Sequence, residues 1–129
     1  MQCLRIYTGP DGESHFGEIE IPLTSIEFFP GLLPLQVSER HRATQVQFVT
    51  VPAEIREASW HNPPEPLLAI WLNGETEFET SDGEIWRLGP GSVVFAEDTW
   101  GKGHISRHPA VEQQIIIISV PDGLVARTT

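Results

Sequence analysis

Two histidines, His61 and His104, bracket the part of the chain whose residue types could do chemistry. His61 lies in the run Trp-His-Asn-Pro-Pro-Glu over residues 60–65, and His104 closes the run Glu-Asp-Thr-Trp-Gly-Lys-Gly-His over residues 97–104. Imidazole titrates near neutral pH, so a neutral ring can accept a proton while a protonated ring donates one. The pair therefore predicts a catalytic acid and base that serve enolisation, dehydration, cyclisation or elimination next to a carbonyl.

Three charged residues beside the second histidine are candidates for supporting roles. Glu97 or Asp98 can orient the imidazole ring or favour its protonated form, and Lys102 can stabilise an oxyanion or bind a carboxylate. Each also has a structural explanation, because acidic residues often cap turns and lysines are usually solvated. His15 and His108 lie in turn-rich segments, and we assign them no specific role.

Four tryptophans are a large aromatic content for a chain of 129 residues. Core packing explains Trp71 or Trp86, which lie inside strand-like segments. Trp60 and Trp100 each lie within four residues of a candidate histidine. Aromatic side chains beside polar groups are typical of a pocket for a flat or apolar ligand. We expect a small-molecule substrate that is uncharged or weakly anionic, with a ring or an unsaturated carbonyl.

Length, charge and cysteine content narrow the class of protein. A chain of 129 residues is near the usual size of one domain and can form a core without disulfides. Its 18 acidic and 8 basic residues give a formal charge of -10, which disfavours nucleic acid and anionic lipid as partners. The chain has one cysteine, no apolar run near the ~20 residues of a membrane helix, and no secretory signal pattern, so we expect a cytoplasmic protein.

Strand signals separated by turn residues dominate the chain. Extended segments are expected over residues 3–8, 16–21, 44–59 (broken at Pro52), 67–72, 75–80, 84–88, 92–97, around His104, and over 113–120. Residues 22–42 contain three prolines and many apolar residues, which predicts a wrapping arm with one helical turn. About ten short strands without a periodic helix predict one all-β domain. Its barrel core would cover residues 44–120, preceded by strands and the arm in 1–43 and followed by a loose tail over 123–129.

Three glycine-rich stretches resemble the central hairpins of the cupins. They are Leu-Leu-Ala-Ile-Trp-Leu-Asn-Gly-Glu over residues 67–75, Asp82-Gly83, and Leu-Gly-Pro-Gly-Ser-Val-Val-Phe over residues 88–95. The resemblance implies a double-stranded β-helix, the jelly-roll barrel of that family. The tryptophan-histidine pair and the Gly-Lys-Gly-His turn resemble a subgroup of small single-domain cupins, although this chain has Glu-Pro-Leu where that subgroup usually has two arginines and a glutamine.

The resemblance also implies a metal site, which this chain matches only in part. Typical cupins have two histidines and a glutamate in the first motif and a third histidine in the second, but Leu67 stands where the glutamate belongs. His61 and His104 remain, and zinc or non-haem iron usually has at least three protein ligands. Glu65 could supply a third ligand, and His41 or Gln47 could reach in from a neighbouring strand. A site without a cofactor and a site with iron, zinc, manganese or nickel both stay open.

Three functions therefore fit the sequence. The first is a small enzyme that uses His61 and His104 for acid–base chemistry, as a lyase, isomerase or cyclase. The second is a metal-dependent oxygenase or lyase with His61, His104 and Glu65 as ligands. The third is a non-catalytic ligand-binding cupin. In each case we expect a homodimer, because the apolar arm from Pro22 to Leu35 can lie across a second copy.

Overall fold

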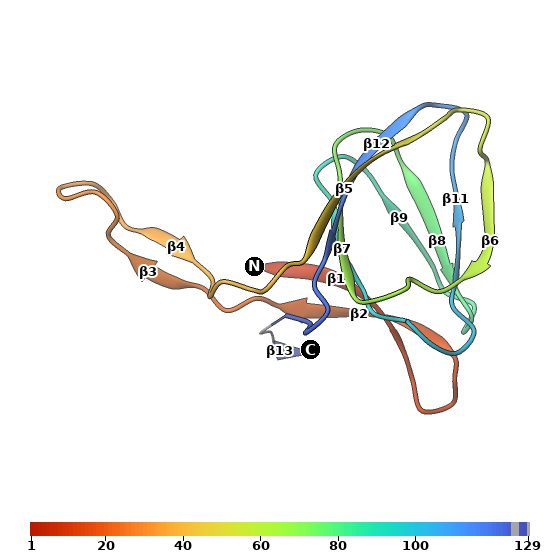
Figure 1. Cartoon of the computed structure of the whole chain (residues 1–129), viewed down its shortest axis with the longest axis horizontal. Coiled ribbons are helices and arrows are strands. Elements are labelled where there is room, and N and C mark those ends of the chain that lie inside the picture. Colours follow the sequence, from red (N-terminus) through yellow and green to blue (C-terminus); the bar gives the residue numbers. More distant parts are fainter. Residues whose placement is uncertain (125–126, 129) are drawn as a thin grey trace.

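Eight consecutive strands form the barrel of the computed structural model, which describes residues 1–124 and 127–128 (Figure 1). They are β5 (Gln45–Val51), β6 (Glu57–His61), β7 (Leu67–Trp71), β8 (Thr76–Thr80), β9 (Ile85–Leu88), β10 (Val93–Ala96), β11 (His104–Arg107) and β12 (Gln113–Ser119). Strands β10, β7, β12 and β5 are neighbours in one sheet, and β6, β11, β8 and β9 form the other. The chain thus crosses repeatedly between two facing sheets.

The pairing of these strands is nested around the β8–β9 hairpin. Outward from that hairpin, β7 pairs with β10, β6 with β11 and β5 with β12, and all four pairs are antiparallel. A long hairpin that winds in this way into two sheets is a double-stranded β-helix, the jelly roll found in cupins. The predicted all-β fold is therefore confirmed.

The N-terminal strands enlarge the first sheet. Strand β1 (Gln2–Thr8) pairs in parallel with β10, β2 (Ser14–Glu20) pairs antiparallel with β1, and β13 (Arg127–Thr128) pairs with β2. This gives a seven-stranded sheet. The tail expected over 123–129 thus includes two residues in a strand, whereas residues 125, 126 and 129 lie outside the described residues.

The expected arm is a β-hairpin that extends away from the barrel (Figure 1). Strands β3 (Thr24–Ile26) and β4 (Leu35–Val37) form a separate two-stranded sheet. At its tip, the Leu32 amide donates to the Phe29 carbonyl at 3.1 Å, and Gly31 has φ 82°. Proline followed by glycine with positive φ is the signature of a type II turn. The predicted helical turn is wrong, because these residues close a hairpin instead.

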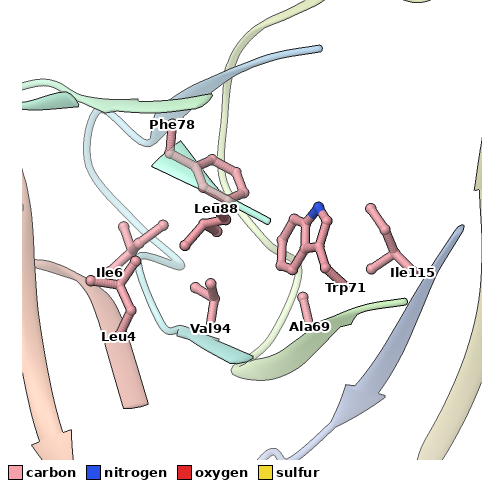
Figure 2. Packing of buried hydrophobic residues seen from close by; sticks show 8 residues of the cluster. All are labelled: Leu4, Ile6, Ala69, Trp71, Phe78, Leu88, Val94 and Ile115. Atoms are coloured by element: carbon pink, nitrogen blue, oxygen red, sulfur yellow. The ribbon is translucent and has the colours of Figure 1, made fainter. Parts of the chain in front are cut away.

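The main core lies between the two sheets of the barrel. Figure 2 shows its buried residues: Leu4, Ile6, Ala69, Trp71, Phe78, Leu88, Val94 and Ile115. Trp71 is 3% exposed and Trp86 is 41% exposed, so of the two tryptophans considered for the core only Trp71 occupies it. A second cluster of Cys3, Ile19, Phe95 and Val120 lies on the opposite face of the larger sheet. Among the described residues, no helix is long and apolar enough to span a membrane.

Candidate functional site

His61 and His104 face each other across the β6–β11 pair. The antiparallel register places the two residues directly opposite, and their ring centroids are 4.5 Å apart with an interplanar angle of 60°. A register shift follows between His104 and Ser106. The structure therefore brings together the two histidines that the sequence singled out.

Gly103 allows this close approach. Its φ is 72°, and a Cβ atom at this position would lie 2.2 Å from the carbonyl oxygen of His61. Any other residue would push the two strands apart and would also be strained in this backbone conformation. The glycine directly before His104 in the Gly-Lys-Gly-His turn is thus required for the histidine pair.

Asp98 holds the buried histidine of the pair. Its Oδ2 lies 2.6 Å from Nδ1 of His104, and the two residues are 0% and 5% exposed. Asn62 donates from Nδ2 to the backbone carbonyl of Asp98 at 2.8 Å, which ties the aspartate loop to the end of β6. An ionised carboxylate at this position selects the tautomer with the proton on Nδ1 and stabilises positive charge on the ring. Nε2 of His104 is then the atom that can take up a proton.

His61 has the same orientation with a different partner. Its Nδ1 lies 2.7 Å from the carbonyl oxygen of Ser59, which can only accept, so Nδ1 carries the proton. In the part of the chain that the structure describes, no hydrogen bond reaches Nε2 of His61 or of His104. Both rings thus present an Nε2 atom that is available to a ligand.

The histidine pair borders a cavity of about 280 Å³ inside the barrel. Apolar side chains from both sheets provide most of its lining, among them Ile6, Leu67, Val94, Ile115 and Ile117. Among the described residues, no lysine, arginine, aspartate or glutamate lines it. Phe78 packs edge-on against His104 with centroids 5.3 Å apart. The lining suits an uncharged molecule, because a charged one would lose its hydration without gaining an opposite charge.

Two further polar residues of β11 and its extension line the cavity, and sequence reasoning missed them. Ser106 and His108 follow His104 at every second position, and all three line the cavity. Strand alternation places such residues on one face, so this signal was present in the sequence. Nδ1 of His108 is 3.2 Å from Gln113 Oε1 and 3.2 Å from Thr76 Oγ1. Burial lowers the pKa of His108, which favours its neutral form.

The aromatic walls of the cavity are Trp71 and Phe78, not the tryptophans expected there. Trp60 is 45% exposed and Trp100 is 55% exposed, and neither lines the cavity. Trp60 directly precedes His61 in β6, so strand alternation turns its side chain to the other face of the sheet. The prediction that both residues form the pocket wall does not agree with this arrangement.

The other sequence candidates also lie away from the cavity. Glu97 pairs with Arg5 on the outer side of the sheet, and Lys102 pairs with Glu13. Glu65 lies in the loop between β6 and β7, and Gln47 is exposed on the edge strand β5. None of these four residues lines the cavity. Of the candidate supporting residues, Asp98 alone contacts a histidine of the pair.

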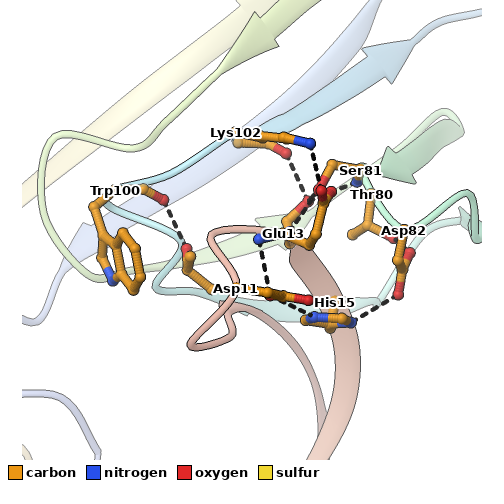
Figure 3. Close-up of polar contacts among 11 residues, drawn as sticks. Asp11, Glu13, His15, Thr80, Ser81, Asp82, Trp100 and Lys102 are labelled. Atoms are coloured by element: carbon orange, nitrogen blue, oxygen red, sulfur yellow. Dashed lines mark hydrogen bonds and ion pairs between the residues drawn. The ribbon is translucent and has the colours of Figure 1, made fainter.

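A polar network supports the turn over residues 100–103, in which Figure 3 labels Trp100 and Lys102. In the turn between β1 and β2, Gly12 accepts a hydrogen bond from the Lys102 amide at 3.0 Å, and Thr8 Oγ1 donates to the Trp100 carbonyl at 2.7 Å. The Ser14 hydroxyl donates to the Gly103 carbonyl at 2.6 Å. The N-terminal hairpin thereby positions the backbone on both sides of the turn before His104.

Ion pairs join this network to the β8–β9 turn. His15 lies between Asp11 and Asp82, with Nδ1 2.9 Å from Asp82 Oδ2 (Figure 3). The hydrogen bond from Lys102 lowers the pKa of Glu13. Burial raises the pKa of Asp82, but hydrogen bonds from the Thr80 hydroxyl and the Glu84 amide outweigh it, so this pKa is also lowered. These carboxylates are held in their ionised form.

The donor atoms around the cavity do not match a usual transition-metal site. Among residues 1–124 and 127–128, no group of three His, Cys, Asp or Glu side chains is placed to hold a metal ion. His61 and His104 offer two Nε2 atoms, and the carboxylate next to them, Asp98, is bonded to Nδ1 of His104. Structural and catalytic zinc sites use at least three protein ligands, so this set is one short.

No protein-family model and no curated protein matches the chain. Among solved structures, it is similar to protein NMB1881 from Neisseria meningitidis, with a TM-score of 0.48 and 13% identity over 65% of this chain and 88% of that one. It is also similar to a cupin domain from Bordetella pertussis Tohama I, with a TM-score of 0.46 and 15% identity over 78% of this chain and 95% of that one. The nested strand pairing described above is what defines the fold.

Proposed function

We propose that this protein is an enzyme that moves a proton next to the carbonyl group of a small, uncharged and largely apolar molecule. The observation that carries the proposal is the pair of oriented imidazoles, 4.5 Å apart, at an apolar cavity. Both rings border the same cavity, so one can accept a proton from a bound molecule while the other donates one to it. One ring then serves as base while the other serves as acid.

The surroundings of the two rings suggest which histidine is the base and which is the acid. His104 is buried and has Asp98 on Nδ1, so its neutral ring can remove a proton through Nε2 and the resulting charge is balanced. His61 is exposed, so its charged form is solvated and it can donate from Nε2 to the carbonyl oxygen. The C–H bond of the substrate breaks, its proton moves to His104, and the proton of His61 forms the O–H bond of an enol.

Return of the proton to another carbon gives an isomerase, and loss of a neighbouring group gives a lyase. Both reactions begin with the same enolisation, so one experiment tests them together. Benzylacetone in D2O with the protein should exchange the hydrogens next to its carbonyl at least ~100-fold faster than in buffer, since positioned acid–base groups typically contribute that much or more. Substitution of either His61→Ala or His104→Ala should remove the effect; exchange that persists in both folded variants would overturn the proposal.

Ligand binding without chemistry is a second candidate, favoured by the scarcity of polar groups in the cavity. Apart from Asn62, Ser106 and the three histidines, the lining is apolar. A binding protein predicts that benzylacetone is retained by the cavity while its hydrogens exchange at the rate found in buffer. The deuterium experiment therefore separates the two functions.

A further inference from the structure

The cavity has a second polar end, built by His108. This residue follows β11, and its amide donates to the Arg56 carbonyl at 2.7 Å, which continues the extended pairing past the end of the strand. His108 lies four positions after His104, which corresponds to roughly 13 Å along a strand. The lining between these two ends is apolar except for Ser106.

Hydrogen bonds around His108 fix which of its ring nitrogens carries the proton. The indole of Trp71 donates to Thr76 Oγ1 at 3.0 Å, and the Thr76 hydroxyl donates to Gln113 Oε1 at 2.9 Å. Nε2 of Gln113 donates to the carbonyl of Glu75. Its Oε1 atom therefore faces Thr76 and His108. A carbonyl oxygen can only accept, so Nδ1 of His108 is the donor and Nε2 of the neutral ring is an acceptor.

We infer that the cavity takes an elongated neutral molecule that carries, at the end remote from its reactive carbonyl, a hydroxyl group that donates to Nε2 of His108. The inference rests on the proposed function for the orientation of the ligand. Among the described residues no hydrogen bond reaches this Nε2, so a ligand hydroxyl is a suitable partner for it. A ligand with an apolar end would leave it without one.

Equilibrium binding of two matched ketones tests this assignment. Benzylacetone and its para-hydroxyl derivative differ only in the remote hydroxyl, and titration calorimetry or NMR gives the dissociation constant of each. We expect the hydroxyl compound to bind about threefold to tenfold more tightly, the value of one neutral hydrogen bond. This preference should vanish in His108→Phe and persist in His15→Phe, because His15 lies outside the cavity.

Several results would overturn the inference. An equal hydroxyl preference in His108→Phe would do so, and so would failure of both ketones to bind at millimolar concentration. Since His108→Phe disturbs the Gln113 pairing and can lower stability, long-range nitrogen-15 NMR of the natural chain gives a second test: Nε2 of His108 should be unprotonated. The binding comparison needs no turnover, so a failure of deuterium exchange with retained hydroxyl preference would refute the proposed chemistry alone.

A separate observation concerns the hairpin formed by β3 and β4. It exposes six large apolar side chains, with Leu33 90% exposed: Ile26, Phe28, Phe29, Leu32, Leu33 and Leu35. An isolated two-stranded hairpin is marginally stable in water. Weighted by their exposed fractions, these side chains together offer roughly 600 Å² of apolar surface, on the basis of about 150–200 Å² for each fully exposed large apolar side chain. The hairpin therefore needs a surface to cover it.

The same chain has a partly exposed apolar surface on the outer side of the larger sheet. The register aligns Phe48, Ile116 and Ile70 across three strands, and next to them Val46, Ile118 and Leu68. Phe48 is 81% exposed and Val46 is 54% exposed. The other four side chains are half-buried, and Leu68 and Ile118 pack against the second core cluster. These six positions hold no charged residue in a chain with a net charge of -10. The outer faces of β5, β12 and β7 thus form an apolar platform without charge repulsion.

We also propose that the β3–β4 hairpin of one copy packs on this platform of a second copy. In a twofold dimer each surface is used twice. The two hairpins offer about 1,200 Å², and the exposed parts of the two platforms bring the total near the ~1,600 Å² of a standard stable interface. The expected occupant is a copy of this chain because each copy supplies both apolar surfaces in equal number. Strand β5 is an edge of the sheet, so the approach is open.

The oligomeric state of the full chain tests this interface. Light scattering should give about twice the chain mass of 14.4 kDa, and both Leu33→Asp and Phe48→Asp should weaken association at least ~100-fold. Ile85→Asp is the matched control, since Ile85 is similarly exposed, at 55%, on the other sheet. A monomer at high concentration, or a dimer that tolerates either of the first two substitutions, would overturn the proposal.

Discussion

Asp98 Oδ2 and His104 Nδ1 are 2.6 Å apart, and both residues are almost completely removed from solvent. The other carboxylate oxygen, Oδ1, has no hydrogen-bond partner among the described residues. The aspartate side chain therefore directs its charge at one donor, the Nδ1–H group of His104. This geometry makes Asp98 a positioning residue whose effect should be measurable through the histidine.

Replacement of Asp98 by asparagine should lower the deuterium-exchange rate by about 100-fold or more, because a neutral amide no longer selects the tautomer or balances the charge on His104. Nitrogen-15 NMR should show a mixture of His104 tautomers. Asp82→Asn is the matched control, because Asp82 bonds His15 at 2.9 Å outside the cavity. An Asp98→Asn protein with full activity would contradict the role assigned here.

Gly103→Ala should destabilise the fold by more than ~2 kcal/mol and reduce activity, because the new methyl group would meet the His61 carbonyl and the backbone has positive φ. Gly83→Ala provides the comparison: it has φ 91° but no atom within 4 Å of the added methyl group, so only the backbone strain of about 1 kcal/mol applies. Denaturant unfolding of both variants gives the difference. Equal losses would mean that contact with His61 is unimportant.

Stability should fall as the pH is lowered below about 5. The folded-state pKa values of Glu13 and Asp82 lie below their ordinary values, so the native state binds fewer protons than the unfolded state there. The stabilisation they provide is present above their unfolded pKa values and is lost as pH falls through the folded ones. Lys102→Met removes the hydrogen bond that lowers the pKa of Glu13, so it should flatten the pH dependence of the unfolding free energy. An unchanged slope would argue that the Lys102–Glu13 bond does not cause this dependence.

The His108 ring should titrate below its ordinary value, since burial lowers its pKa. Its neutral form is therefore the stable one in the folded chain, and the associated stability is present above the unfolded pKa and decreases as pH falls below it. Proton NMR of the ring between pH 4 and 8, with the same chain unfolded in urea as reference, measures this shift. A His108 ring that titrates at or above the reference would contradict the buried position.

Much of the barrel was predictable from local signals. The expected segments 67–72 and 113–120 match β7 and β12 to within a residue, because glycine turns and β-branched runs mark their limits. The arm was misread because its prolines were taken only as evidence against one continuous helix, whereas Pro30-Gly31 forms the turn of a hairpin. A proline-glycine turn predicts a hairpin only when the segments on both sides of it are recognised as strands.

Residues of the site could be predicted only where they lie close together in the sequence, on one strand or in the loop next to it. Asp98 and His104 are six residues apart and were considered together, and His108 could have been found by following the alternation of β11 past its end. The partners of Glu97 and Lys102 could not be found, since Arg5 and Glu13 come from the N-terminal hairpin. Contacts between distant segments depend on register, which the sequence pattern alone did not provide.

The nested order of strand pairing has a consequence for how the protein acquires its site. The β8–β9 hairpin closes the shortest loop, and each further pair closes a longer one, with the β6–β11 pair third in the series. Because closure entropy rises with loop length, the inner hairpins can form without the outer pairs, whereas His61 and His104 meet only after most of the barrel has assembled. The histidine pair therefore forms late in folding, so recovery of the proposed deuterium exchange during refolding would report completion of the barrel.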